Sequence, residues 1–147
     1  MYRNILVPID GSRLSDKAVK EAAMLAQAGD AKLLLFHVVA PYQMPVYAEG
    51  MNIPSLPRAS AAKKSARRAG RILASAEKRA RAAKVPASRA WAISGTPHDA
   101  IVEIARKRRC DLIVMASHGR TGLSKFLLGS ETQAVLAMVK VPVLVVR

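Results

Sequence analysis

The sequence is poor in cysteine, in aromatic residues and in acidic residues. Cys110 is the only cysteine among 147 residues, which excludes an intramolecular disulfide and leads us to expect a reducing, cytoplasmic compartment. A chain of this length buries a core without disulfides or a structural metal. The histidines His37, His98 and His118 are dispersed and lack metal-ligand spacing. No catalytic triad or pair of carboxylates is visible, so any hydrolysis is expected to be slow and incidental.

Long apolar runs are also missing. No stretch approaches the roughly 20 apolar residues that span a bilayer. The first ten residues reach a proline and an aspartate too early for a signal peptide. We therefore expect no membrane contact and a single domain over residues 1–147.

Acidic residues are too few to balance the 24 lysines and arginines, and the net charge is +14. Eleven of these cations lie between Arg58 and Arg89, against the single acid Glu77, so this segment carries +10. A basic helix face is most often simply solvated. The alternative is an interaction surface for an acidic partner or nucleic acid on helix 59–84, although the interleaved aromatics of single-strand binders are absent.

Apolar patterning predicts strands that alternate with helices. Strands are expected at residues 5–9, 32–39, 88–94, 111–117 and 141–147. Helices are expected from Ser12 up to a stop at Gly29, over 59–84, from Thr96-Pro97 onward and over 130–140. The proline-rich stretch 40–57 is expected to be a long loop. This order predicts an α/β fold: a doubly wound, five-stranded parallel sheet of strand order 3-2-1-4-5 with helices on both faces.

Helix ends and buried faces follow from particular residues. Ser12, Thr96 and Ser130 are predicted N-caps, with Gln133 placed for a capping box, and Gly29 is the expected stop of the first helix. The expected buried face of that helix consists of Leu14, Ala18, Ala22 and Leu25. Small residues recur along helix 59–84 at steps of three and four and predict close packing on the sheet: Ala62, Ala66, Ala69, Leu73, Ala76, Ala80 and Ala83.

The winding direction of such a sheet reverses between strands 1 and 4, and ligands bind beyond the carboxyl ends of strands at that point. Pro8–Asp10 and Met115–Gly119 would lie there as neighbours. Gly119 and Gly122 follow strand 4, and Gly129-Ser130 opens a helix. Glycines let backbone N–H groups converge on a phosphate, and a helix N-terminus attracts anions. The spacing is equally consistent with glycines that only form a turn and a serine that only caps a helix. Neither a Walker A nor a Gly-x-Gly-x-x-Gly motif is present. His118 lies within this segment and could orient a phosphate.

Several segments together resemble the universal stress protein family over essentially the whole chain. They are Ile5–Ser12, Leu35–Val38, Asp111–Gly122, Leu127–Ser130 and Pro142–Val146. The nucleotide-binding branch of that family has the motif Gly, two residues, Gly, nine residues, Gly-Ser/Thr. Gly119 and Gly129-Ser130 match this spacing, whereas Ala116 stands where the motif has glycine.

The resemblance implies an ATP-binding regulatory stress-response protein, with Mg²⁺ accompanying the nucleotide. Asp10 would hold the ribose hydroxyls, Pro8 and Ile9 would wall the base, and the backbone of Val38 would contact adenine. Met115 and Ala116 would line the sugar and first phosphate. The phosphates would lie at Gly119, Gly129 and Ser130, with Glu131 and Thr132 adjacent. A homodimer through strand 142–146 is also implied.

Each of these residues has an ordinary structural alternative. Asp10 could cap the turn before the first helix, and Val38 and Met115 could be core residues. Glu131 would repel phosphates unless it points away from them or meets a metal ion.

Overall fold

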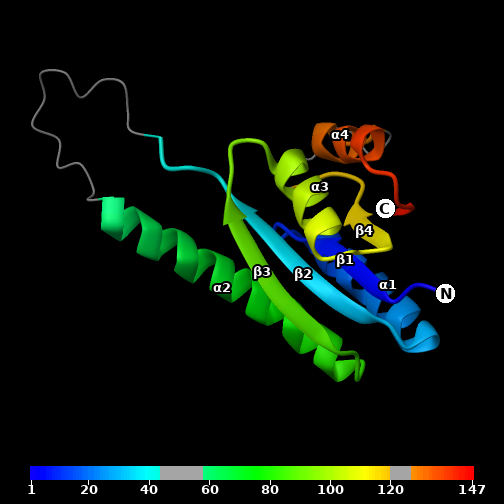
Figure 1. Cartoon of the computed structure of the whole chain (residues 1–147). Helices are drawn as coiled ribbons and strands as arrows, with labels where there is room; N and C mark the ends of the chain where they lie inside the picture. Colours follow the sequence, from blue (N-terminus) through cyan, green and yellow to red (C-terminus); the bar gives the residue numbers. More distant parts are fainter. Residues whose placement is uncertain (44–57, 120–126) are drawn as a thin grey trace, which may run out of the picture.

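The computed structural model describes residues 1–43, 58–119 and 127–147. Strands and helices alternate along the described chain (Figure 1). The elements are β1 (Asn4–Pro8), α1 (Arg13–Gly29), β2 (Lys32–Val39), α2 (Arg58–Ala82), β3 (Ala87–Ile93), α3 (Pro97–Lys107), β4 (Leu112–Ala116), α4 (Ser130–Met138) and β5 (Val143–Val146). The strands form one parallel sheet in the order β3-β2-β1-β4-β5, which confirms the predicted fold class and strand order.

Two apolar clusters cover the two faces of the sheet. Ile5 and Val7 of β1 pack with residues of α1 and α2, whereas Leu6, one position between them, packs with Ile101 of α3 and Val135 of α4. Successive side chains of a strand point to opposite faces, so a strand buried on both faces reads as a continuous apolar run. This is why the central strands were visible in the sequence.

The sheet opens at the position where the winding direction reverses. β1 pairs with β2 from Asn4 to Pro8, but the pairing of β1 with β4 covers only Ile5 with Leu112 and Leu6 with Ile113. The two central strands therefore lose contact toward their carboxyl ends. This leaves a crevice at the predicted switch point.

The first helix differs from the prediction at both its face and its end. Ser12 is its N-cap as predicted, and its side chain accepts a hydrogen bond from Ser15 N at 3.1 Å. Leu25 is 40% exposed, because Ala22, Ala23 and Ala26 form the buried face there instead. Gly29 is the last helical residue rather than the stop, and Asp30 adopts the left-handed conformation with φ 52°.

α2 is packed along only part of its length. Ala69, Leu73, Ala76 and Ala80 are buried against β2 and β3, as the small-residue pattern predicts. Ala62 and Ala66 of the same pattern are exposed, because the first turns of α2 extend beyond the edge of the sheet (Figure 1). Among the described helices none is both long and apolar enough to cross a membrane.

Candidate functional site

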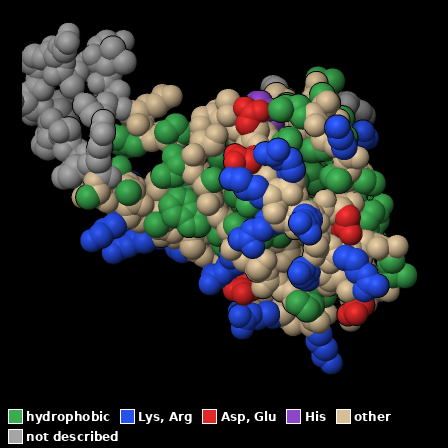
Figure 2. All heavy atoms as spheres, in the orientation of Figure 1, with side chains coloured by type: hydrophobic (Ala, Val, Ile, Leu, Met, Phe, Trp, Pro, Cys, Tyr) green, Lys and Arg blue, Asp and Glu red, His purple; other side chains and the backbone are tan. Residues whose placement is uncertain are grey.

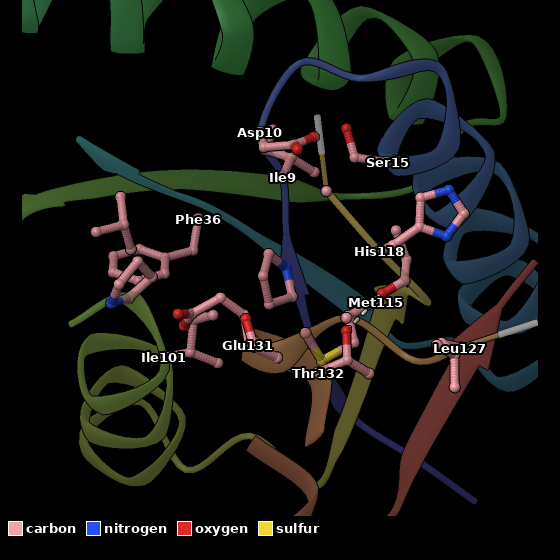
Figure 3. Close-up of a pocket in the computed structure, with 17 residues that line it drawn as sticks. Ile9, Asp10, Ser15, Phe36, Ile101, Met115, His118, Leu127, Glu131 and Thr132 are labelled. Atoms are coloured by element: carbon pink, nitrogen blue, oxygen red, sulfur yellow. Dashed lines mark hydrogen bonds between the residues drawn. The ribbon is translucent and has the colours of Figure 1, made fainter. Parts of the chain in front are cut away.

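A cavity of about 260 Å³ lies at the carboxyl ends of β1 and β4, between the first turns of α3 and α4 (Figure 3). All twelve residues predicted for the site line it: Pro8, Ile9, Asp10, Val38, Met115, Ala116, His118, Gly119, Gly129, Ser130, Glu131 and Thr132. They come from four separate parts of the chain. Gly122 and the other residues between Gly119 and Leu127, 120–126, lie outside the described residues.

Five further lining residues were not predicted as site residues: Ser15, Phe36, Pro97, Ile101 and Leu127. Phe36 and Ile101 are buried in the apolar cluster beneath α3 and α4, where they resemble ordinary core residues. Pro97 is in the first turn of α3, which begins at the same edge of the sheet. The signal that could have found it is the βα connection itself, because helices that follow parallel strands begin at the ligand-binding edge.

Part of the cavity lining is apolar. It consists of Pro8 and Ile9 of the β1 end, Phe36 and Val38 of β2 and Met115 of β4. The registered pairing of β1 with β2 stops at Pro8 and Phe36, so Val38 lies beyond the last registered pair. One residue beyond this last pair, the buried ring of His37 donates a hydrogen bond from Nδ1 to the carbonyl of Ile9 at 2.7 Å. A flat apolar ring fits such a slot, with backbone atoms at its rim.

Asp10 contributes a polar part of the same lining. Its Oδ1 accepts a hydrogen bond from Ser12 N at 2.9 Å across Gly11, whose φ of 81° favours glycine. The expected turn-capping role of Asp10 is therefore present. A Cβ on Gly119 would lie 3.0 Å from Oδ2 of Asp10, so the β4 end passes directly beside this carboxylate. Asp10 thus caps its own turn and also lines the cavity.

The β4 end and the start of α4 are held against each other by two hydrogen bonds. Gly129 N donates to Ser117 O at 2.7 Å, and Thr132 Oγ1 donates to Ala116 O at 3.0 Å. A Cβ on Gly129 would lie 3.1 Å from His118 Cα and 3.3 Å from Ser117 O. Only glycine permits this approach without a shift of the backbone, which explains a glycine at this position even though its φ of −62° is ordinary.

The start of α4 corrects one predicted cap. Gly129, rather than Ser130, is the N-cap, and no side chain caps the helix from that position. Gln133 does not close a capping box, since its Nε2 donates to Leu128 O at 2.7 Å. The first backbone N–H groups of a helix have no acceptor within the helix. With glycine as the cap, these groups and the positive end of the helix dipole are available at the cavity wall.

Glu131 points away from this helix terminus. Its Oε2 accepts a hydrogen bond from His98 N at 2.8 Å and from His98 Nδ1 at 3.0 Å. Thr96 occupies the N-cap position of α3, but its side chain makes no cap hydrogen bond, so Glu131 supplies the acceptor instead. His98 is therefore held between the first turns of α3 and α4. The first of the two expectations for Glu131 holds, because its carboxylate is turned toward α3.

Ala116 and His118 complete the wall. Among the described non-glycine residues only Asp30, Lys84 and Arg109 have positive φ, so the backbone at Ala116 does not require glycine. His118 Nδ1 is hydrogen-bonded to the hydroxyl of Ser117 at 3.1 Å. Within the part of the chain that is described, no three His, Cys, Asp or Glu side chains are grouped to hold a metal ion.

Comparison with known families gives a match over the whole chain. The family described as "Universal stress protein family" matches residues 1–147. A universal stress protein of Thermus aquaticus, from the region 3′ of a QAH/OAS sulfhydrylase, is 34% identical over 147 residues, which cover 100% of both chains.

Solved structures of similar proteins share the fold. Universal stress protein MJ0577 of Methanocaldococcus jannaschii superimposes with a TM-score of 0.82 at 29% identity, over 99% of this chain and 96% of that chain. A universal stress protein in complex with cAMP superimposes with a TM-score of 0.70 at 29% identity, over 99% of this chain and 97% of that one.

Proposed function

The chain belongs to the universal stress protein family, and on that premise we propose that it is a regulatory protein that binds an adenine nucleotide in the cavity between β1 and β4. The observation that carries the proposal is the joining, in one cavity, of an apolar slot, a carboxylate and an uncapped helix N-terminus. A relative at 29% identity has been solved with cAMP, which contains the same base, sugar and phosphate chemistry.

Each part of the nucleotide is assigned to one part of the cavity. Adenine lies in the slot between Pro8, Ile9 and Met115, with the backbone of Val38 at its edge. The ribose hydroxyls donate to Asp10, whose Oδ1 already faces the Ser12 amide. Phosphate oxygens accept from backbone N–H groups at Gly119 and at the first turn of α4, where the helix dipole adds to their attraction.

ATP fits this assignment because successive phosphates extend from the α4 terminus along the wall formed by Ala116, His118 and Gly119. We propose that Mg²⁺ enters with the triphosphate and is held mainly by phosphate oxygens and water. This is the usual manner of binding where the protein offers few carboxylates. Asp10 is the carboxylate on the polar wall, since Glu131 is engaged by His98.

We also propose a homodimer through the C-terminal strand, residues 142–146. β5 is an edge strand of the sheet, and its Leu144 is 40% exposed. The neighbouring helix α4 exposes Leu136 and Met138. An apolar edge strand invites pairing with a second chain, so sedimentation at micromolar concentration should give a dimer. A monomer at that concentration would remove this part of the proposal.

Two experiments test the proposal. In the first, the purified protein is denatured and any released ligand is identified by mass spectrometry. In the second, a thermal-shift assay measures the melting temperature with and without ATP and Mg²⁺. We expect an adenine nucleotide in the supernatant, or a rise in melting temperature when ATP is added. Absence of both would contradict nucleotide binding. It would favour the alternative from the sequence, an interaction protein that acts through its basic helix.

A further inference from the structure

The side of α2 that faces away from the sheet carries a row of cations. Seven exposed residues form it, here called the outer stripe: Lys63, Lys64, Arg67, Arg68, Arg71, Lys78 and Arg81. At 3.6 residues per turn they fall within an arc of about 140°. The buried residues Ala69, Leu73, Ala76 and Ala80 are centred on the opposite side. In Figure 2, Lys and Arg side chains follow the margin along which α2 runs in Figure 1.

Acidic neighbours neutralise the end of α2 but not its beginning. Arg79 pairs with Asp16 at 2.8 Å, and Arg81 pairs with Glu77 at 3.2 Å. Among the described residues, no carboxylate pairs with the other six members of the outer stripe. Five of these six unpaired cations lie between Lys63 and Arg71, so the unpaired charge is concentrated toward the beginning of α2.

This charge arrangement is unfavourable for an isolated helix. Lys63 with Arg67, Lys64 with Arg68, and Arg67 with Arg71 are like-charge pairs at spacing i,i+4, which repel one another. The first turn of α2 contains no acidic residue to complement the helix dipole. Gly70, which weakens a helix interior, has open space around it, so packing does not account for it. A polyanion bound along the stripe would relieve the repulsion.

From this arrangement we propose that the outer stripe of α2 binds the phosphate backbone of double-stranded nucleic acid, with little dependence on sequence. The stripe spans about 27 Å at 1.5 Å per residue, and charges in the row Lys63, Arg67 and Arg71 recur every ~6 Å. This is a site separate from the nucleotide cavity. It is carried by the described residues of α2 alone.

The composition of the stripe favours this partner over two others. The positions between its cations are Ser60, Ala74, Ser75 and Ala82, which are all small. A membrane-surface helix needs large apolar residues beside its cations. Hot spots of protein interfaces combine Arg with buried Trp and Tyr, and α2 contains no aromatic residue. Single-strand binders stack bases on aromatics. A row of cations with none of these features suits a backbone of regularly spaced phosphates.

The test is fluorescence anisotropy of the full chain with a labelled DNA duplex of about 20 base pairs, across roughly 50–200 mM salt. We expect saturable binding. The logarithm of the binding constant should fall linearly with the logarithm of the salt concentration. The triple variant Lys63→Gln, Arg67→Gln and Arg71→Gln should reduce the slope by about 2.7, at ~0.9 per lost contact, and weaken binding by roughly tenfold or more. The charge-retaining variant Lys63→Arg, Arg67→Lys and Arg71→Lys should bind like the wild type.

A matched control removes three exposed cations elsewhere, Lys20→Gln, Arg106→Gln and Lys140→Gln, so that the net charge of the two triple variants is equal. Circular dichroism of all variants checks that the helices remain. The proposal is overturned by three results: no duplex binding by the wild type at the lowest salt, an equal loss in the control, or displacement of the duplex by polyglutamate or anionic vesicles at equal charge concentration.

Discussion

Glu131 Oε2 accepts hydrogen bonds from both the backbone N–H and the Nδ1 of His98, at 2.8 and 3.0 Å. The contact joins the first turn of α4 to the first turn of α3 at the cavity wall. It caps α3 where Thr96 does not, and it turns a carboxylate away from the helix N-terminus assigned to phosphate. One side chain thus has a structural role and also leaves the cavity wall suited to anions.

The first prediction concerns this contact. Glu131→Ala should lower the free energy of unfolding by about 1 kcal/mol, the usual effect of losing a helix cap. Glu131→Gln keeps an acceptor oxygen, so its free energy of unfolding should fall by less. Urea denaturation of both variants measures the difference. If Glu131→Ala unfolds at the wild-type urea concentration, the cap assigned to this side chain is wrong.

Two glycines give opposite predictions for the same substitution. Gly129→Ala places a Cβ 3.1 Å from His118 Cα, so the backbone must shift and stability should fall by roughly 1–3 kcal/mol. Gly70→Ala meets no atom within 4 Å in a helix interior and should raise stability by about 0.5–1 kcal/mol. Thermal melts of the two variants should therefore move in opposite directions. A Gly129→Ala variant that melts at or above the wild-type temperature would show that the close approach at Gly129 is not a constraint.

Ala116 stands where the family motif has glycine. Because its φ is not positive, glycine is not needed there for conformation, and the alanine differs only by a methyl group at the cavity wall. Ala116→Gly should therefore raise ATP affinity by no more than roughly 10- to 200-fold, the effect of about one methylene in a packed site. Fluorescence titration with an ATP analogue measures it. An increase of several hundredfold would mean that the methyl group blocks the phosphates in the natural chain.

Cys110 should be unreactive in the folded protein. Burial, with a smaller contribution from the neighbouring Asp111, raises the pKa of its thiol to about 11. Only the thiolate attacks alkylating agents, and a pKa two units above normal lowers its fraction at pH 8 by about 100-fold. Iodoacetamide labelling should be slow in buffer and rapid in urea. Rapid labelling of the native protein would contradict the burial of this residue.

Much of the fold was readable from the sequence because its central strands are buried on both faces. Runs such as Ile5–Ile9 and Lys32–Val39 carry no polar alternation, and the helices between them force a parallel sheet. The switch-point rule then brought Asp10 and Met115 together although they are far apart in sequence. The twelve predicted lining residues follow from that topology and from the family motif.

The parts that the sequence did not predict depend on contacts between distant segments. The helix cap supplied by Glu131 to α3 has no local pattern, and a local rule assigned that cap to Thr96. Ala23 and Ala26 replaced Leu25 in the buried face of α1 because the sheet accepts small residues at close range. Phe36 and Ile101 resemble ordinary core residues in the sequence. They line the cavity because β1 and β4 diverge beside them.

The most direct test of the account is a calorimetric titration of the protein with ATP and Mg²⁺ at about 0.15 M salt, where surface electrostatics are largely screened. The variants Ser130→Asp and Ser130→Asn are measured alongside. Ser130 is exposed in the first turn of α4, where an added carboxylate suits the helix but repels phosphate.

We predict saturable binding at one site, at least tenfold weaker in Ser130→Asp and nearly unchanged in Ser130→Asn. The Lys63→Gln, Arg67→Gln and Arg71→Gln variant should bind ATP like the wild type. A wild-type titration without saturable heat, or a Ser130→Asp variant that binds as tightly as the wild type, would contradict the assignment of this cavity to an adenine nucleotide.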